Sequence, residues 1–362
     1  MGTVRSVDAY EGRRVTLRVA VIGLGVGEQH ARAIAAHPSA TLAVVCDLDR
    51  ARAQLIADDV RADVSSGARN GSDVRSASDT PRVVDAIDAV IDAPDIDAIV
   101  LATYDDQHAS QVLRAFAAGK HVFCEKPLCR TIDELRAIAT ARGALHLRCN
   151  LILRAAPLYR WLREAIRDGE LGDVYAIDGD YLYGRLHKIT EGWRTGVDDY
   201  SVMQGGGVHL VDLAMWLVGE RPARVTAVGN RIVTKDTAFR YPDFVAATFE
   251  LPSGIVMRIT ANFGSVHKHQ HVLRVFGSKA TFIVDDAGAR LHTVRDPGEP
   301  PRLIAHAPVA ANKGDLVPGF VDAILAGEDP APAARHELDV ITACIAADRA
   351  LATHEPVAID YR

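Results

Sequence analysis

The residues best suited to chemistry in this 362-residue chain are Glu125, Lys126 and Pro127. They follow the short apolar segment 121–124, HVFC, which is typical of a buried strand. Open α/β sheets bind their ligands at the carboxyl ends of such strands. Because Pro127 cannot extend a central strand and favours extended conformations in the residue before it, it holds Lys126 at a fixed exit angle. The Lys126 ammonium could then polarise a substrate hydroxyl or carbonyl; the alternative is an ordinary solvent-exposed lysine at a strand end.

A glycine-rich turn lies near the start of the chain, in the segment VAVIGLGVGEQH at 19–30. Glycine lets such a turn close tightly and lets its backbone approach a pyrophosphate, whose charge is favoured at a helix N-terminus. The usual spacing is G-x-G-x-x-G, but here the third glycine comes one residue early and Glu28 stands in its place. A purely structural turn is the alternative. The residues that we assign to the cofactor phosphates are Gly23, Gly25, Val26 and Gly27.

An acidic residue, Asp47, directly follows the second apolar segment of the chain, 41–46. A carboxylate at this place accepts hydrogen bonds from the ribose diol of a dinucleotide and repels a 2′-phosphate. The sequence therefore favours NAD as the cofactor, although Arg50 and Arg52 keep NADP open as an alternative.

The elements that must position these residues alternate between strand and helix through the first half of the chain. Apolar segments predict strands at 19–22, 41–46, 98–102, 121–124 and 145–149. Helices are predicted at 28–36, 50–57, 83–91 and 107–118, and Thr131 with Glu134 forms a capping box that opens one more. This alternation predicts an α/β Rossmann fold, which is a doubly wound parallel sheet.

From residue 157 onward the pattern changes. A helix at 157–168 is followed by predicted strands at 174–184, 224–233, 244–251, 255–263, 271–276 and 281–284. Further helices are predicted at 208–217, 314–326 and 336–352. Consecutive strands without crossover helices indicate an α+β domain with a large, mainly antiparallel open sheet.

These changes divide the chain into three parts. Residues 1–14 read as a polar N-terminal arm, 15–149 as the dinucleotide-binding Rossmann domain, and 150–362 as the α+β substrate and oligomerisation domain. The segment 61–82 is rich in Ser, Gly, Asp and Arg, and it reads as a surface loop, with a functional lid as the alternative.

The composition narrows the class of protein. With 48% hydrophobic and 24% charged residues and a net charge of −6, the chain has no basic character that would favour nucleic acid as a partner. No apolar run approaches the length of a membrane span, and the N-terminus lacks the apolar core of a signal peptide. The five cysteines lack zinc-type spacing, so buried free thiols in the cytoplasm are expected.

Four elements occur in order along the chain: the glycine turn, ATYDDQH at 102–108, CEKPL at 124–128, and GGGVHLVD at 205–212. Together they resemble the Gfo/Idh/MocA family of NAD(P)-dependent oxidoreductases. The resemblance implies hydride transfer between the nicotinamide and a secondary alcohol of a sugar, a sugar derivative or a cyclitol. It also implies a homodimer or homotetramer formed through the open sheet.

The resemblance assigns roles to individual residues. It implies that Lys126 and His209 are catalytic and that Asp212, one helical turn after His209, contacts the substrate. It places a further set of residues beside the cofactor, namely Thr103, His108, Glu125 and Lys126.

Two departures from the family pattern bear on the site. Tyr104 replaces the usual proline, and Gly205 stands where many members carry an aspartate four residues before the histidine. The missing group could come from Asp198, Asp199 or Tyr200, or Lys126 could work with His209 alone.

The segment 181–201, which precedes His209, is rich in aromatic and cationic residues. A sugar site favours flat rings and forked hydrogen-bond donors, so we take Tyr200, Arg185, Trp193 and Arg194 as substrate-binding candidates. Several cations here would also suit a phosphate or a carboxylate on the substrate. An exposed loop or an oligomer contact is the alternative for any one of these residues.

Three histidines at 267, 269 and 271 alternate along a probable strand, which would place them on one face. That pattern could bind a metal, but an interface or solvent-facing position is the favoured interpretation, and we predict no metal.

Two other functions remain open at this point. An NAD-dependent glycosidase or lyase would use transient oxidation and give no net NADH. A redox-silent dinucleotide-binding sensor would bind NAD without turnover; the glycine at position 205 permits it, whereas Lys126 and His209 argue against it.

Overall fold

A computed structural model describes residues 16–65 and 80–362, so the predicted arm at 1–14 and most of the predicted loop at 61–82 lie outside the described residues. Residues 61–65 of that predicted loop continue a helix. The chain divides into two compact units, one of residues up to Asn150 together with 311–337, and the other of 151–310 together with 338–362.

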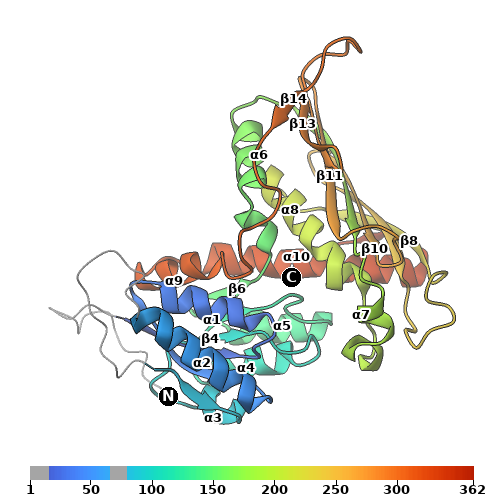
Figure 1. The fold of residues 1–362 in the computed structure, drawn as a ribbon. Coiled ribbons are helices and arrows are strands. Elements are labelled where there is room, and N and C mark those ends of the chain that lie inside the picture. The colour runs from blue at the N-terminus through green and yellow to red at the C-terminus, as the bar shows by residue number, and fades with distance from the viewer. Residues whose placement is uncertain (1–15, 66–79) are drawn as a thin grey trace. The chain divides into compact units, whose positions relative to one another are not determined.

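The first unit contains a parallel sheet with the strand order β3-β2-β1-β4-β5-β6 (Figure 1). Its strands are β1 (Leu17–Ile22), β2 (Ala40–Cys46), β3 (Arg82–Val84), β4 (Ala98–Leu101), β5 (His121–Cys124) and β6 (Leu147–Cys149). The order changes direction between β1 and β4, which is the point where doubly wound sheets bind dinucleotides. The predicted Rossmann architecture is confirmed.

Helices connect these strands. They are α1 (Gly27–Ala36), α2 (Arg50–Ser65), α3 (Ile87–Ile91), α4 (His108–Ala117) and α5 (Ile132–Ala141). The Thr131–Glu134 capping box that opens α5 is present as predicted. The prediction of one helix over 83–91 was wrong, because Val83 and Val84 pair with β2 as strand β3 before the short helix α3 begins.

The domain boundary also needs a correction. The second domain was expected to be continuous from residue 150, but helix α9 (Val317–Leu325) belongs to the first unit. Its apolar side chains Val317, Phe320 and Val321 are buried in the core that β1 and α1 form. The chain therefore returns to the first unit, because packing in this core removes the apolar face of α9 from water.

The second unit contains a mainly antiparallel sheet with the order β14-β13-β12-β11-β7-β10-β9-β8-β15, in which only β7 and β10 pair in parallel among the described strands. Its strands are β7 (Val174–Leu182), β8 (Arg224–Asn230), β9 (Phe244–Glu250), β10 (Val256–Asn262), β11 (Gln270–Gly277), β12 (Thr281–Asp285), β13 (Gly288–His292), β14 (Arg302–Ile304) and β15 (Val357–Ala358). The predicted α+β architecture is confirmed, and the strands β13, β14 and β15 were not foreseen.

Helices α6 (Pro157–Arg167) and α8 (Val208–Val218) lie along one face of this sheet (Figure 1). The remaining helical segments are η2 (Ile152–Ala155), α7 (His187–Thr190), η3 (Trp193–Gly196), the π-helical turn η4 (Met203–Gly207) and α10 (Ala331–Thr353). Alternate residues on β8 and β10, including Val228 and Val256, are exposed on the other face. Among the described residues, no helix is both long enough and apolar enough to cross a membrane.

Candidate active site

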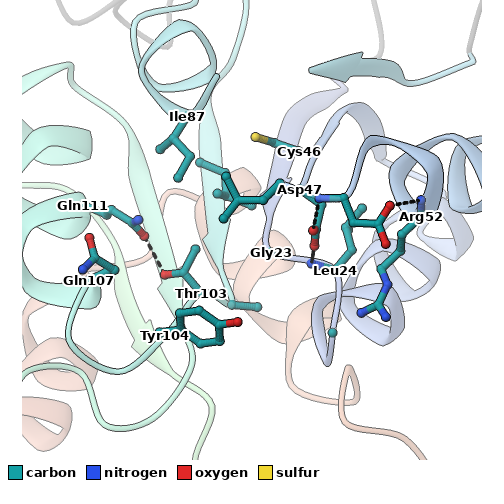
Figure 2. A pocket seen from close by; sticks show the side chains of 15 residues that line it. Gly23, Leu24, Cys46, Asp47, Arg52, Ile87, Thr103, Tyr104, Gln107 and Gln111 are labelled. Carbon is teal, nitrogen blue, oxygen red and sulfur yellow. Dashed lines mark hydrogen bonds between the residues drawn. The ribbon is translucent and has the colours of Figure 1, made fainter. Parts of the chain in front are cut away.

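A cavity of about 580 Å³ lies where β1, β2 and β4 end (Figure 2). Figure 2 shows Thr103, Tyr104 and Gln107 on one side of it and Asp47 and Arg52 on the other. The full lining consists of Ile22, Gly23, Leu24, Gly25, Cys46, Asp47, Leu48, Asp49, Arg52, Ile87, Ala102, Thr103, Tyr104, Gln107 and Gln111. Its place and size are those of a dinucleotide site in a doubly wound sheet.

The three glycines of the turn, Gly23, Gly25 and Gly27, have different structural roles. Gly23 has a φ of +85°, and a Cβ there would lie 2.4 Å from the carbonyl oxygen of Ala102. A Cβ on Gly27 would lie 3.2 Å from the side chains of Val21 and Ala102, so this glycine lets α1 pack closely on the sheet. A Cβ on Gly25 would meet nothing within 4 Å, which leaves the backbone open to a ligand. The turn fits a pyrophosphate despite its compressed spacing.

Glu28, which stands in place of the usual third glycine, does not disturb this turn. Its half-exposed side chain accepts hydrogen bonds from Arg32, one helical turn later. Gly27 already provides the close approach, so the residue after it is free to vary.

Asp47 ties the end of β2 to the glycine turn. Its two carboxylate oxygens accept hydrogen bonds from the backbone N–H groups of Leu24, at 2.6 Å, and Asp49, at 2.8 Å. The carboxylate therefore has a fixed place at the edge of the cavity. Arg52 lines the same cavity, whereas Arg50 binds Asp85 at the surface.

Thr103 and His108 were both predicted to border the cofactor, and the structure separates them. Thr103 lines the cavity and donates a hydrogen bond to Gln111 at 2.7 Å. His108 is fully buried, with Nδ1 2.6 Å from the carbonyl oxygen of Pro127 and Nε2 3.2 Å from that of Thr103. His108 therefore joins the loop after β4 to the loop of Lys126, and it does not line the cavity.

Glu125 is buried and held from two sides. Its Oε1 lies 2.9 Å from Nε2 of His30 and accepts a hydrogen bond of 2.6 Å from the amide of Asn150. Burial alone would raise the pKa of this carboxyl, but the hydrogen bond and charge of His30, the charge of Lys126 and the Asn150 amide outweigh it and lower the pKa to about 2. Glu125 anchors the loop rather than lining the cavity, and the neighbouring Lys126 remains partly exposed.

His209 lies on α8 in the second unit, among rings from two strands. Its imidazole stacks on Tyr181 at 6.1 Å between ring centroids and meets His271 edge-on at 5.8 Å. Tyr181 also contacts His269 and His271, each at 5.2 Å. Sequence reasoning missed Tyr181 and His271 as neighbours of His209.

The hydroxyl of Tyr200 fills the space beside Gly205. A Cβ at position 205 would lie 2.3 Å from that hydroxyl oxygen, which accepts a hydrogen bond of 3.1 Å from Nε of Arg194. Tyr200 is buried, whereas Asp198 and Asp199 are exposed. Of the three candidates for the group missing at position 205, the structure brings Tyr200 to that place and leaves the two aspartates in solvent.

The Asp212 carboxylate is fully buried and engaged by Arg154. The Arg154 Nε lies 3.0 and 2.9 Å from its two oxygens, and an Nη lies 2.5 Å from one of them. This two-point ion pair joins α8 to η2. Asp212 was predicted to contact the substrate, and in this structure its observed partner is Arg154.

Asp348 on α10 is a half-buried residue that sequence reasoning did not single out. Its oxygens accept hydrogen bonds from Ser201, at 2.7 Å, and from the Gln204 amide, at 2.8 Å. Burial raises the pKa of Asp348 to about 6, with these neutral donors opposing the shift only in part. Gln204 belongs to η4, so Asp348 supports the turn from which α8 starts.

The cationic segment before Tyr200 contributes Arg185. Its guanidinium lies over the ring of Tyr183 at 4.8 Å and hydrogen-bonds Tyr181. Arg194 lies over Trp193 at 4.4 Å, and Trp193 itself is half-buried.

The prediction that three histidines share one strand face was wrong. β11 begins at Gln270, and His267 lies in the preceding segment, where its Nε2 lies 2.8 Å from a carboxylate oxygen of Asp286. His269 and His271 turn toward Tyr181 instead. Within residues 16–65 and 80–362, no group of three or more histidine, cysteine or acidic side chains is arranged to hold a metal ion.

The side chains that sequence reasoning missed carried a weak signal. Tyr181 lies on β7 and Tyr183 directly follows the strand, and a spacing of two residues places side chains on one face of an extended chain. His30 and Asn150 lie 95 and 25 residues from Glu125, and only the folded sheet brings them together.

Comparison with known families agrees with this geometry. Residues 17–150 match the family described as "Oxidoreductase family, NAD-binding Rossmann fold", named GFO_IDH_MocA. Residues 159–283 match the "GFO/IDH/MocA C-terminal domain". The two matches cover most of both units.

Individual proteins are similar over nearly the whole chain. Inositol 2-dehydrogenase of Rhizobium meliloti is 27% identical over 359 residues, covering 95% of this chain and 100% of the relative. The structure of scyllo-inositol dehydrogenase from Lactobacillus casei with bound NAD(H) and scyllo-inositol superposes with a TM-score of 0.73 at 20% identity, covering 95% of this chain and 99% of that chain. Its form without ligand gives the same TM-score and identity, covering 95% and 98%. A levoglucosan dehydrogenase in complex with NADH and levoglucosan gives 0.79 at 20% identity, covering 96% and 100%. At these identities the two structures show a shared fold.

Proposed function

Because the chain belongs to the Gfo/Idh/MocA family of oxidoreductases, we propose that it transfers a hydride between NAD and a secondary alcohol carbon of a cyclitol or sugar. The observation that carries the proposal is the cavity of the first unit, where an open Gly25 backbone and a fixed Asp47 carboxylate suit a pyrophosphate and a ribose diol. The names of the relatives, inositol 2-dehydrogenase and levoglucosan dehydrogenase, support cyclitols and anhydrosugars as the first substrates to test.

The bound nicotinamide would supply the hydride chemistry, and the chain would position the substrate and move the proton. We assign the hydroxyl proton to His209, a step worth a rate factor of about 10²–10⁴. Lys126 polarises the reacting oxygen. The Glu125 anchor supports this role because it fixes the backbone from which Lys126 extends.

The Tyr200 hydroxyl lies beside Gly205, four residues before His209. The Arg194 hydrogen bond holds this hydroxyl, and buried contacts with Phe239 and Phe263 hold the Tyr200 ring. We propose that this phenol orders the substrate next to the imidazole. Asp212 then acts through Arg154, by keeping α8 in position.

The experiment is a rate measurement at 340 nm with NAD and a panel of myo-inositol, scyllo-inositol, levoglucosan and common aldoses. Turnover of at least one of them is expected, with Lys126→Met and His209→Ala each lowering kcat at least about 100-fold. Near-normal turnover in both variants would reject the assignment. NAD binding without reduction, together with cleavage of a glycoside, would favour the glycosidase instead, and NAD binding with no turnover at all would favour the sensor.

We also propose a homo-oligomer formed through the exposed face of the nine-stranded sheet. Exposed Val228 and Val256 lie on this face, with the ion pair of Arg258 and Asp178 beside them. Light scattering of the purified protein tests this, and Val256→Asp should shift a dimer or tetramer toward smaller species. A monomer at micromolar concentration would overturn the proposal.

A cytoplasmic location is proposed on the state of the cysteines. All five are free and buried, and burial raises the pKa values of Cys124 and Cys344 well above the usual range. Such thiols are typical of proteins kept under reducing conditions. Fractionation of cells expressing the tagged chain would test this.

A further inference from the structure

The partly buried arginines of the second unit differ in how their charge is balanced. Arg154, Arg274 and Arg290 each bind a carboxylate of the same unit, namely Asp212, Asp180 and Asp285. Arg185 does not. Across residues 16–65 and 80–362, no carboxylate lies within ion-pair distance of Arg185, and its Nε is shielded from solvent without a hydrogen-bond partner.

The surroundings of Arg185 are aromatic. Its guanidinium lies over the ring of Tyr183 at 4.8 Å and hydrogen-bonds Tyr181. Rings can hold a guanidinium in place, but they do not neutralise it as a carboxylate does. A partly buried guanidinium charge that no carboxylate balances carries an energetic cost, which an anionic ligand would offset.

The place of Arg185 ties it to the reacting group. Tyr181, its hydrogen-bond partner, stacks on His209 at 6.1 Å. The charges of Arg185 and Arg194 both act on the Tyr181 phenol and lower its pKa, although burial, the larger effect, raises that pKa overall. Arg185 and the imidazole that we assign to the proton are therefore both neighbours of Tyr181.

We infer that Arg185 is a receptor for an anionic group on the substrate, so that the enzyme acts on a sugar or cyclitol bearing a carboxylate or a phosphate. The inference rests on the proposed function. A flat guanidinium carries paired, parallel N–H donors, and two oxygens of one carboxylate or phosphate match that spacing. A neutral polyol supplies no such pair of charged acceptors.

The test compares matched substrates that differ only in charge. D-Glucuronate is set against D-glucose, and D-galacturonate against D-galactose, with NAD and the full-length protein; D-glucose 6-phosphate forms a third arm. We expect kcat/KM to favour one of the anionic substrates over its neutral partner at least tenfold. Preference for a uronate identifies the group as a carboxylate, and preference for the 6-phosphate identifies it as a phosphate. Equal or better rates with the neutral sugars would overturn the inference.

Arg185→Met removes the charge and keeps the length of the side chain. It should lower the ratio of kcat/KM for the preferred anionic substrate to kcat/KM for its neutral partner at least about 30-fold, as expected for the loss of a charge-assisted two-point contact. Arg185→Lys should give a kcat/KM for the anionic substrate between that of the wild type and that of Arg185→Met. Arg231→Met, at an exposed arginine of the same unit, is the matched control and should change neither rate. An equal loss on both substrates in Arg185→Met would show a structural role and reject the inference.

A binding measurement separates this inference from the hydride-transfer proposal. Calorimetry with the NADH-loaded Lys126→Met variant follows the binding of D-glucuronate and D-glucose 6-phosphate without turnover. Binding of either anion that is lost on adding Arg185→Met supports the receptor even if no sugar is oxidised. No binding of either anion, or binding that is unchanged in Arg185→Met, overturns it.

Discussion

Each unit of this protein buries a carboxyl group beside a residue assigned to catalysis, and the two groups behave in opposite ways. Glu125, next to Lys126, has a pKa lowered to about 2, whereas Asp348, which supports the turn before His209, has one raised to about 6. Burial acts to raise the pKa of both carboxyls. The partners differ, because Glu125 meets His30 and Lys126 as well as an amide, and Asp348 meets only the neutral donors Ser201 and Gln204.

The comparison shows that partners, rather than depth, decide how a buried acid behaves. The first unit holds its reactive loop with an acid that is ionised throughout the physiological range. The second unit holds its reactive helix with an acid that titrates close to neutrality. Loss of stability in acid should therefore originate at Glu125 in the first unit, and loss of stability as pH rises through about 6 at Asp348 in the second unit.

The two units also place different obstacles beside their critical glycines. A Cβ at Gly23 would meet the backbone of Ala102 at 2.4 Å, and a Cβ at Gly205 would meet the side-chain hydroxyl of Tyr200 at 2.3 Å. Backbone in a sheet cannot move aside, but a side-chain end can. The first unit is therefore the less tolerant of the two.

The largest expected effect comes from replacing these two glycines by alanine, which tests the difference between the units directly. Gly23→Ala combines a backbone clash with a left-handed conformation and should cost about 4 kcal/mol of unfolding free energy. Gly205→Ala should cost about 1–2 kcal/mol, because the end of the Tyr200 side chain, with its hydroxyl at 2.3 Å and its Cζ at 2.9 Å, must shift rather than the backbone. Urea unfolding measures both. Equal losses would mean that Tyr200 is as rigid as the sheet.

Gly25→Ala is the matched control within the turn. Nothing in the protein meets its Cβ, so stability should stay within about 0.5 kcal/mol, while NAD binding weakens because the methyl group enters the cavity. Unchanged NAD affinity would contradict the assignment of this turn to the pyrophosphate.

Glu125→Gln should have the next largest effect, a loss of about 3 kcal/mol, because it leaves the partners of a buried charge uncompensated. Since the folded pKa of Glu125 is lowered to about 2, its contribution is present above the unfolded pKa and is lost as pH falls toward 2. The gap between the wild type and the variant in urea unfolding should therefore narrow between pH 5 and pH 3. Glu28→Gln is the control: Glu28 belongs to a half-exposed ion pair with Arg32, and its free energy of unfolding should stay near that of the wild type.

Asp348→Asn should raise the free energy of unfolding at neutral and alkaline pH, whereas Glu125→Gln lowers it. Because the folded pKa of Asp348 is raised to about 6, the wild type has its full free energy of unfolding below the unfolded pKa. It progressively loses part of that free energy as pH rises through 6. The asparagine variant should match the wild type near pH 4 and exceed it by about 3 kcal/mol at pH 8, the value of two pKa units. Unfolding curves from pH 4 to pH 8 test this, with exposed Asp236→Asn as the control. A wild type that keeps its stability at pH 8 would contradict the prediction.

Asp47→Ala should give the smallest change, a shift in cofactor preference. Loss of this carboxylate beside Arg52 should raise the affinity for NADP relative to NAD about tenfold, or about 1.4 kcal/mol. Quenching of intrinsic fluorescence by each cofactor gives the two Kd values. An unchanged ratio would show that Asp47 serves only to close the turn.

Local patterns in the sequence determined the cofactor unit well. The alternation of strand and helix, the glycine turn and the acid after the second strand depend on residues close together in the chain, and these parts of the prediction agree with the structure. The family resemblance rested on similarly short segments, 102–108, 124–128 and 205–212, and it is confirmed.

Only the tertiary structure decided what surrounds Lys126 and His209. The partners of Glu125 come from α1 and from the residue that follows β6, and those of His209 come from β7 and β11. The group beside Gly205 comes from a loop in which three residues were equal candidates. Helix α9 likewise returns to a core formed nearly 300 residues earlier. Sequence spacing could not reveal these contacts, because strand order and register, rather than distance along the chain, bring such side chains together.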